Sequence, residues 1–255
     1  MPAEPDPSLC LLWRHVASAP EPSAPVRRGP KQKLSVDAVV DAAIEIADRD
    51  GLGALAMRGL AEQLGLGVMS LYTYVPSRND LIALMVDQAL GRTALPPLPD
   101  DLAERLELII RIQYADVRAH PWLTEVTGIR AWLGPHSADR YEWHLSAVEG
   151  IGLDDIEMDQ TVSLLVGFAM NIARAEHEVR LAERESGTSE LEWWESNAET
   201  LGDLMAHRDY PIAGRVGSAA GEAYQAASDP ARALEFGLAR IIDGILAHLE
   251  RPRPQ

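Results

Sequence analysis

The sequence lacks residues and runs that several large protein classes need. Among its 255 residues it has one cysteine, Cys10, so it cannot build an internal disulfide framework or, alone, a cysteine zinc site. No apolar run approaches the roughly 18 residues of a membrane-spanning helix. The stretch LCLLW near the N-terminus is too short for a signal peptide and has no basic leader. We therefore expect a soluble protein of the reducing cytoplasm that does not enter a membrane.

Signatures of catalysis are also missing. The sequence has no G-x-S-x-G, no Walker loop and no cofactor fingerprint. The stretch HEVRL, which begins at His177, lacks the second histidine of the zinc motif H-E-x-x-H. We predict no enzyme activity, no cofactor and no metal, with an all-helical enzyme as the alternative from another class.

Positive charge is scarce in the chain as a whole but not in one segment. The net charge of -16 argues against nucleic-acid binding, which depends on lysine and arginine. Between residues 27 and 78, however, seven basic residues stand against six acidic ones, which leaves +1. Four of these bases form an acid-free arm before the first strong helix: Arg27, Arg28, Lys31 and Lys33. We predict that this arm contacts DNA, and a solvated charge run is the alternative.

The first 30 residues differ in composition from the rest. They hold seven of the 17 prolines, so we expect a mostly disordered N-terminal arm over 1–30. The apolar stretch from Leu9 to Trp13 is the exception, since it is able to form one short helical turn against the body of the protein. After Leu34 the pattern is helical, with glycine and proline between helices and no alternating strand pattern. The sequence therefore predicts an all-α protein.

A helix-turn-helix is predicted over 31–78. Ser35 is a plausible N-cap for a helix that ends at Gly51 and places apolar residues at spacings of three and four. Two short helices follow, over 57–64 and 68–74, and the glycine-containing turn between them has the length of a helix-turn-helix. A fourth helix, capped by Ser77, is expected to run to Gly91.

The outer face of the helix at 68–74 has chemistry suited to DNA. Hydroxyl groups can donate to phosphates, and apolar side chains can touch thymine methyl groups. The candidate DNA contacts are Val68, Met69, Ser70, Tyr72, Thr73 and Tyr74. Core packing is the alternative role for the two tyrosines, and Leu71 and Val75 are predicted to be core. Because no arginine or glutamine stands here, we expect DNA shape to contribute to recognition.

The stretch RRGPKQKLSVDAVVDAAIEIADRDGLGALAMRGLAEQLGLGVMSLYTYVPSRNDLIALMVD resembles the N-terminal domain of TetR-family regulators over its whole length. The resemblance implies a homodimeric repressor that binds a palindromic operator and is released by a small-molecule inducer. It also implies that Arg58 meets a phosphate or base, that Tyr72 anchors on a phosphate, and that Arg78 clamps the flanking strand. Gly59 departs from the family, where a long side chain is usual, and this removes a possible phosphate contact.

Residues 79–255 are predicted to form a larger helical domain, joined rigidly to the first and used for ligand binding and dimerisation. Helices are expected near 101–118, 121–131, 137–150, 154–186, 190–207 and 229–250. TVSLLVGFAMNIARAE and PARALEFGLARIIDGILAHLE resemble the tetracycline-repressor subgroup, which implies a four-helix bundle formed by two copies of the helices near 154–186 and 229–250. The broad apolar face of the last helix supports this pairing: Leu234, Leu238, Ile241, Ile242, Ile245 and Leu249. A monomer with a wide core is the alternative.

Aromatic and histidine residues accumulate where the pocket for an inducer is expected, between the fifth and eighth helices. Aromatic rings with a few polar groups suit an apolar or aromatic ligand. The predicted lining is Trp132, His144, Phe168, Asn171 and His177. Two alternatives stay open, because a closed core and a ligand cavity give the same periodicity: a helix-turn-helix regulator that senses a protein partner, and an activator.

Overall fold

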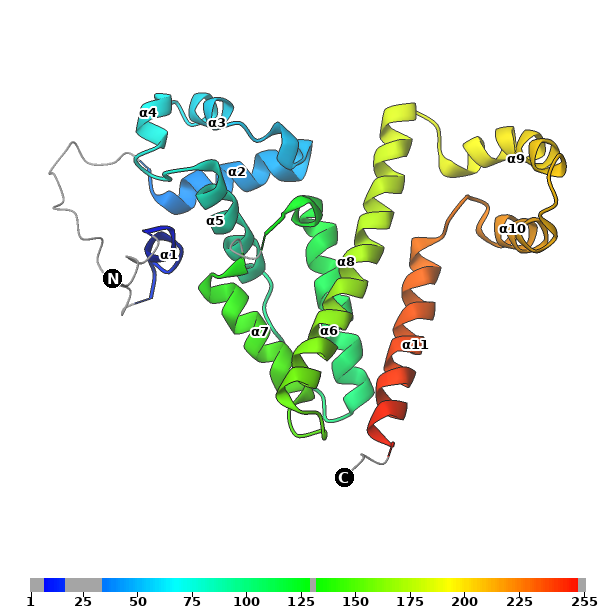
Figure 1. The fold of residues 1–255 in the computed structure, drawn as a ribbon. Helices are drawn as coiled ribbons and strands as arrows, with labels where there is room; N and C mark the ends of the chain where they lie inside the picture. Colours follow the sequence, from blue (N-terminus) through cyan, green and yellow to red (C-terminus); the bar gives the residue numbers. More distant parts are fainter. Residues whose placement is uncertain (1–6, 17–33, 129–131, 252–255) are drawn as a thin grey trace, which may run out of the picture.

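The computed structural model describes residues 7–16, 34–128 and 132–251, and within these ranges it contains helices and no strands (Figure 1). The predicted all-α fold is confirmed. The helix-turn-helix lies at one end, and the larger set of helices is built around the long helix α8 (Asp155–Ser186).

Three helices make the predicted helix-turn-helix unit: α2 (Val36–Asp50), α3 (Met57–Gln63) and α4 (Val68–Leu71). The Ser35 hydroxyl caps α2 by accepting a hydrogen bond from the Ala38 backbone N–H at 3.1 Å. Gly51 ends α2 at φ 82°, a conformation that favours glycine, and the short 3₁₀ helix η1 (Leu52–Ala54) follows. The positions of α2 and α3 agree with the sequence prediction to within one residue, and α4 begins where it was predicted but ends earlier.

The last turn of the predicted recognition helix is tighter than expected. Only Val68–Leu71 is α-helical, and the backbone N–H groups of Thr73 and Tyr74 donate three residues back, to Ser70 and Leu71. In such a 3₁₀ turn, side chains three residues apart lie on the same side. Tyr74 therefore lies on the side of Leu71, which is fully buried.

Helix α5 (Arg78–Gly91) connects this unit to the rest of the chain, and the Ser77 side chain caps it as predicted. The larger domain then follows with α6 (Leu102–Ala119), α7 (Pro135–Val148), α8 and α11 (Pro230–Leu249). Helix α8 packs along α6 and α11, and α7 packs against α5. The helix predicted at 121–131 is wrong in extent. It is the short 3₁₀ helix η2 (Pro121–Glu125), because the backbone turns extended at Val126 and reaches φ 91° at Gly128.

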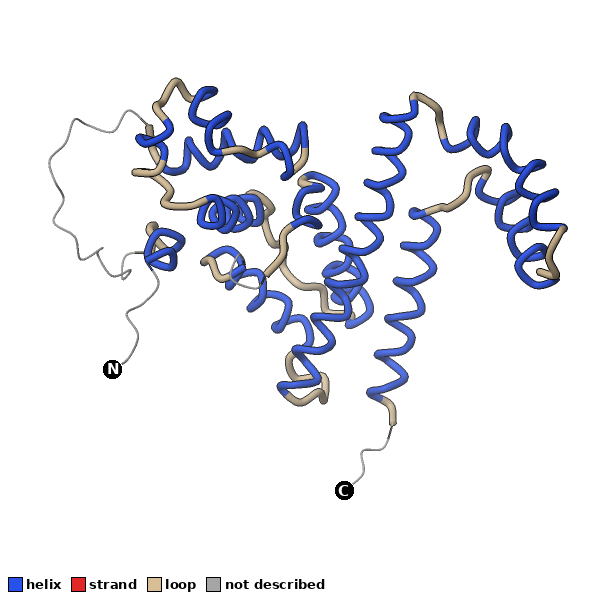
Figure 2. The backbone as a smooth tube through the Cα atoms, turned by 45° about the horizontal axis from the view of Figure 1, so that its top comes forward, coloured by secondary structure: helices blue, strands red, loops and turns tan. Residues whose placement is uncertain are grey.

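Between α8 and α11 the chain forms a projecting pair of helices, α9 (Glu190–Ala206) and α10 (Pro211–Tyr224). Figure 2 shows them standing beyond the ends of α8 and α11, away from the other helices. Helix α9, which is described in full, buries none of its side chains, and the two helices meet where Gly221 lies under Trp194. Helix α9 was predicted, whereas α10 was not.

The hydrophobic core has two parts. One, the core of α2 to α5, lies mainly among these helices and also takes in side chains of the larger domain: Val117, Trp122, Leu123 and Ala173. It includes Leu12 from the short N-terminal helix α1 (Pro7–Leu12), in a stretch whose sequence was too short to decide whether it forms a helical turn. The other lies among α6, α7, α8 and α11. Tyr114 of α6 packs against both parts, so the boundary between them falls at the C-terminal half of α6.

Candidate DNA-binding surface and ligand-binding interior

Most of the predicted DNA contacts on α4 and in the turn after it face solvent. Met69 is 79% exposed and Tyr72 is 40% exposed, and Ser70 and Thr73 are also exposed. Val68 is half-buried and packs against the core of α2 to α5. The Thr73 hydroxyl donates to the Ser70 carbonyl at 2.7 Å, so its oxygen is left to accept. The surface carries neutral groups able to lie against base edges and phosphates.

The two tyrosines have different surroundings. Tyr74 is only 6% exposed and belongs to the hydrophobic core, together with Leu71 and Val75, which were predicted there. A buried ring cannot lie against a base in this conformation, so the prediction of Tyr74 as a DNA contact is corrected to a packing role. Tyr74 stands three residues after the fully buried Leu71, on the same side of the turn, and therefore points inward. Tyr72 keeps the exposure that a phosphate contact needs.

The predicted arginine contacts also differ from one another. The Arg58 side chain is 83% exposed and pairs with Glu62 one helical turn away at 3.3 Å, so it is free to turn toward a phosphate. Arg78 instead donates to the carbonyls of Leu52 at 2.8 Å and Leu55 at 3.1 Å. In this structure it joins the start of α5 to η1 and does not extend as a clamp. Gly59 is exposed with open space around it. Arg27, Arg28, Lys31 and Lys33 lie outside the described residues.

Four polar side chains are buried between α6 and α7, and we call them the polar layer: Gln113, Asp116, Arg140 and His144, each at most 4% exposed. Arg140 and Asp116 form an ion pair, with 2.7 Å between Nη1 and Oδ2. Asp116 also accepts from the Thr93 hydroxyl at 2.6 Å, and Arg140 donates to the Leu90 carbonyl at 3.2 Å. The polar layer is therefore bonded directly to the last turn of α5 and the residues after it.

Arg140 Nη1 and Asp116 Oδ2 interact as the ion pair, without the alignment of a hydrogen bond. Three further groups of the polar layer have no hydrogen-bond partner among the described residues: Gln113 Nε2, Arg140 Nε and His144 Nε2. An unpartnered buried polar group costs about 1–3 kcal/mol, so three of them in one place are an unusual concentration. Burial, reinforced by the neighbouring Arg140 charge, lowers the pKa of His144 to about 4, which leaves the imidazole neutral near pH 7. Burial also raises the pKa of Asp116, against the opposing effects of Arg140 and Thr93.

The residues predicted to line the ligand pocket do not converge. His144 lies in the polar layer, but Phe168 of α8 faces α11, where a Cβ on Gly237 would come within 2.4 Å of its ring. Asn171 is exposed on α8, His177 is half-buried further along the same helix, and Trp132 packs against the core of α2 to α5. Of the five, the structure places only His144 in the polar layer.

Three members of the polar layer were missed by sequence reasoning: Gln113, Asp116 and Arg140. A signal was present on α6, whose buried stripe reads Leu106, Ile109, Ile110, Gln113, Asp116 and Val117. Two polar residues at core positions of an otherwise apolar stripe indicate a buried polar site, because such groups are rarely buried without a partner.

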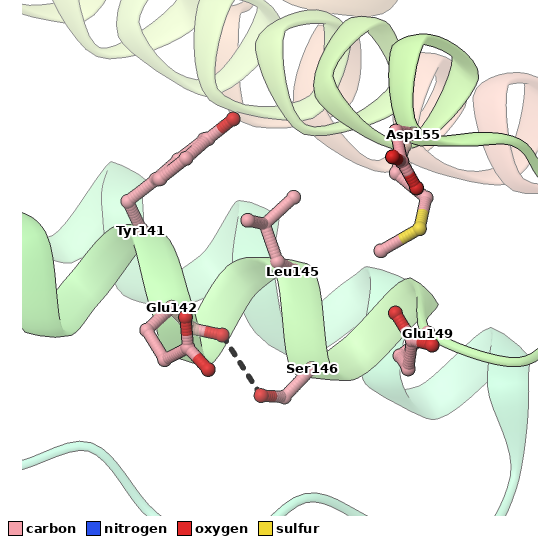
Figure 3. Close-up of a pocket in the computed structure, with 7 residues that line it drawn as sticks. Tyr141, Glu142, Leu145, Ser146, Glu149 and Asp155 are labelled. Carbon is pink, nitrogen blue, oxygen red and sulfur yellow. Dashed lines mark hydrogen bonds between the residues drawn. The ribbon is translucent and has the colours of Figure 1, made fainter.

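A separate cavity of about 420 Å³ lies between α7 and the start of α8 (Figure 3). Tyr141, Leu145 and Met158 contribute apolar surface, while the carboxylates of Glu142, Glu149 and Asp155 stand around it. The three acidic groups are exposed and water-facing. None of the predicted ligand residues lines this cavity, and its acidic rim does not suit an apolar ligand.

The two domains are joined by polar contacts at the end of α2. Asp48 accepts from Trp122 Nε1 at 2.7 Å and lies 2.7 Å from His120 Nδ1, so η2 is bonded to the C-terminal turn of α2. The Leu52 backbone N–H donates to the Glu125 carboxylate at 3.3 Å. The end of α6 and η2 are therefore bonded directly to α2 of the DNA-binding unit.

A further contact joins α5 to α7. The 5%-exposed carboxylate of Asp87 accepts from the Ser137 backbone N–H at 3.0 Å and contacts His136 Nδ1 at 2.8 Å. A residue of α5 therefore caps the N-terminus of α7, whose own N-cap Gly134 has no side chain to do so. The close contact between Asp87 and the start of α7 requires glycine at position 134, since a Cβ there would lie 2.1 Å from Asp87 Oδ1.

The described residues contain neither a cluster suited to a metal ion nor a helix suited to a membrane. Across the described ranges, no three potential ligands gather that could hold a metal ion. None of the helices described is both long and apolar enough to span a bilayer.

Comparisons with known proteins agree with this architecture. Residues 95–249 match the family model described as the tetracyclin repressor-like C-terminal domain. The HTH-type transcriptional repressor DrrR1 of Streptomyces coeruleorubidus is 36% identical over 240 residues, which cover 93% of this chain and 84% of that protein. An HTH-type transcriptional regulator of Saccharopolyspora erythraea is 27% identical over 210 residues, covering 74% of this chain and 87% of its own.

Solved structures give the same result. The apo structure of ActR from Streptomyces coelicolor superposes with a TM-score of 0.67 at 28% identity, covering 88% of this chain and all of ActR. The structure of ActR in complex with actinorhodin matches with the same values. Together with the family model and the similarity to DrrR1, this shows that the chain belongs to the TetR family of helix-turn-helix transcriptional regulators.

Proposed function

We propose that this regulator binds a palindromic operator as a homodimeric repressor and leaves it when a small molecule enters the polar layer between α6 and α7. The observation that carries the proposal is the polar layer itself. It combines several buried, unpartnered groups with direct bonds to the end of α5. A ligand that satisfies these groups gains hydrogen bonds that the unliganded protein lacks.

The chemistry of the polar layer defines the kind of inducer. Gln113 Nε2 and Arg140 Nε are donors, so they call for oxygen acceptors on the ligand. The charge of Arg140 is already balanced by Asp116, so an uncharged acceptor such as a carbonyl is favoured over a free anion. Apolar cores on both sides of the layer favour an apolar, aromatic body. The structure of ActR with actinorhodin supports a small-molecule inducer for this relative of ActR.

The proposed release of DNA begins with the ion pair. A ligand that draws Arg140 and Asp116 into new hydrogen bonds loosens their bonds to the Leu90 carbonyl and to Thr93. The end of α5 then shifts, and the separation of the two recognition helices in the dimer changes. Because half-sites lie about one DNA turn apart, a changed separation lowers operator affinity.

The dimer is proposed to form through α8 and α11. Their outward faces carry exposed apolar side chains, with Ile156 at 72%, Leu164 at 51% and Phe236 at 65%. A Cβ at Gly244 would meet no other atom, so the surface there is open to a close approach by a partner helix. Sedimentation of Leu164→Glu, with Leu204→Glu on the projecting α9 as the control, tests this face. We expect only Leu164→Glu to give monomers.

The function is tested by operator binding with and without ligand. DNA fragments selected from the host genome by the purified protein supply the operator, and actinorhodin and related aromatic carbonyl compounds serve as probes. We expect a probe to weaken operator binding in the wild type, and Gln113→Leu to lose that response while still binding DNA. A protein that selects no DNA refutes the repressor, and a probe response unaffected by Gln113→Leu refutes the site. If deletion of the regulator's own gene lowers expression of the genes next to the selected DNA fragments, the protein is an activator.

A further inference from the structure

The N-terminal segment of residues 7–16 is docked on the body of the protein, beside α5 (Figure 1). Helix α1 continues into a turn in which the Trp13 N–H donates to the Leu9 carbonyl at 2.9 Å and the Val16 N–H donates to Trp13 at 2.9 Å. Leu12 is 4% exposed and belongs to the core of α2 to α5, with Leu11 and Trp13 packed around it. The segment therefore contributes to a core that it reaches from outside the helix-turn-helix.

Side chains of the same segment make polar contacts with both domains. The Trp13 indole Nε1 donates to the Leu133 carbonyl at 2.7 Å, 120 residues away, in the connection that leads into α7. Arg14 and His15 both contact the carboxylate of Asp37 in the first turn of α2, with 3.1 Å between His15 Nε2 and Asp37 Oδ1. Burial acts to raise the pKa of Asp37, but the hydrogen bonds from Arg14 and His15 outweigh it and lower the pKa. Ten residues thus join α2, α5 and the start of α7.

Helix α2 is consequently anchored near both ends. Asp37 is held by the N-terminal segment, and Asp48 is held by His120 and Trp122 of η2. Eleven residues separate the two aspartates, which is about 16 Å along an α-helix. One anchor leaves a helix free to pivot about that point, whereas two anchors at this separation fix its direction. Because α3 and α4 share a hydrophobic core with α2, the direction of α2 bears on theirs.

We propose that residues 7–16 are an interdomain strap, which fixes the orientation of the helix-turn-helix relative to the larger domain and so strengthens operator binding. This inference rests on the proposed function, because it concerns the same operator complex. The strap acts through orientation, since a dimer must present its two recognition helices at a fixed separation. It does not act by touching phosphates, because its own cation Arg14 is only 19% exposed and is paired with Asp37.

Cys10 provides a chemical probe of whether the strap is docked on the body of the protein. Cys10 is the only cysteine, it lies in the strap, and it is partly buried there. Its reaction with a thiol reagent such as dithiobis-nitrobenzoate therefore reports how often the strap opens, without any added label. This measurement needs no DNA, so it separates failure of the strap from failure of the proposed function.

The experiment compares the full-length wild type with the double variant Leu12→Ala, Trp13→Ala and with Leu9→Ala. Leu9 lies in the same helix but is 40% exposed, so it controls for a leucine-to-alanine change in that segment. We expect Cys10 to react about tenfold or more slowly in the folded wild type than in urea, and to approach the urea rate only in the double variant. Thermal unfolding checks that all three proteins fold.

Operator affinity is then measured over a range of salt concentrations. We expect the double variant to bind about three- to tenfold more weakly, with an unchanged slope of affinity against salt, because no phosphate contact is lost. Rapid labelling of Cys10 in the wild type would overturn the docking. If Cys10 labelling shows that the strap is open in the double variant but operator affinity is unchanged, the proposed role of the strap is wrong. If the slope of affinity against salt decreases by about 1, the segment contacts DNA directly and does not act through orientation.

Discussion

The substitution Arg140→Met tests the polar layer most directly. Arg140 and Asp116 are each 4% exposed, and their paired atoms lie 2.7 Å apart. Removing the guanidinium leaves a buried carboxylate that, among the described residues, accepts a hydrogen bond only from the Thr93 hydroxyl. Breaking a buried ion pair in this way costs about 3–5 kcal/mol. Methionine fills much of the vacated space, so most of the loss is electrostatic. We expect a decrease of that size in the free energy of unfolding at pH 7.

The effect of pH on this loss has a definite sign. Burial raises the pKa of Asp116 and Arg140 opposes that rise, so the pKa is higher still in the variant. A carboxyl with a raised folded pKa binds its proton more readily in the folded than in the unfolded protein, so the variant regains stability as the pH falls through that pKa. Loss of Arg140 also removes its repulsion of protonated His144, which acts in the same direction. The difference from wild type should therefore shrink in acid.

Urea unfolding at one fixed protein concentration measures these changes, since the stability of a dimer depends on concentration. The double variant Asp116→Leu, Arg140→Met removes both charges and should recover to within about 1–2 kcal/mol of the wild type. A loss below about 1 kcal/mol for Arg140→Met at pH 7 would refute the reasoning. A double variant as unstable as the single one would show that packing, and not an unpaired charge, sets the cost.

Three further predictions follow from individual contacts. The pKa of His144 is lowered from 6.5 to about 4 in the folded protein, so protonation disfavours folding. The free energy of unfolding should therefore fall by about 3 kcal/mol as the pH drops from about 6.5 toward 4. His144→Gln should flatten this part of the curve of stability against pH. Tyr72→Phe should weaken operator binding about tenfold, as expected for one hydrogen bond to a phosphate, whereas Tyr74→Phe should bind nearly as the wild type does; equal effects in a filter-binding assay would contradict the assignment of Tyr74 to the core. Gly134→Ala should lower the free energy of unfolding by about 1–3 kcal/mol because its Cβ would meet Asp87 at 2.1 Å, whereas Gly53→Ala, with open space around it, should be almost neutral.

Helix starts were predictable from local sequence, because caps act within one turn. Ser35 and Ser77 each accept a hydrogen bond from the backbone three residues ahead, as a capping serine should. The helix α10 was missed because three glycines, Gly214, Gly217 and Gly221, weaken helix propensity and leave no continuous apolar stripe. Its glycines instead permit close packing, as at Gly221 beneath Trp194.

The candidate ligand site was harder to predict because it depends on which helix faces surround one another. Aromatic residues such as Phe168 suggested a pocket, yet that ring packs against Gly237 of α11. His144 was among the predicted lining residues, but Arg140 appears as an ordinary polar residue until α7 is placed on α6. Tyr74 was easier, because its position three residues after the core residue Leu71 places it on the buried side in an α-helical turn as well as in a 3₁₀ turn.

The polar layer is connected to the DNA-binding unit by two routes that differ in length. Arg140 reaches the end of α5 through one hydrogen bond to the Leu90 carbonyl, whereas Asp116 lies one helical turn before His120, which contacts Asp48 at the end of α2. In the proposed mechanism a ligand that separates Asp116 from Arg140 acts on both routes at once. Shifting α5 alone would be resisted by the contacts that hold α2 at Asp48. In this mechanism, release of DNA therefore requires both connections to move, and the ion pair is the contact that joins them.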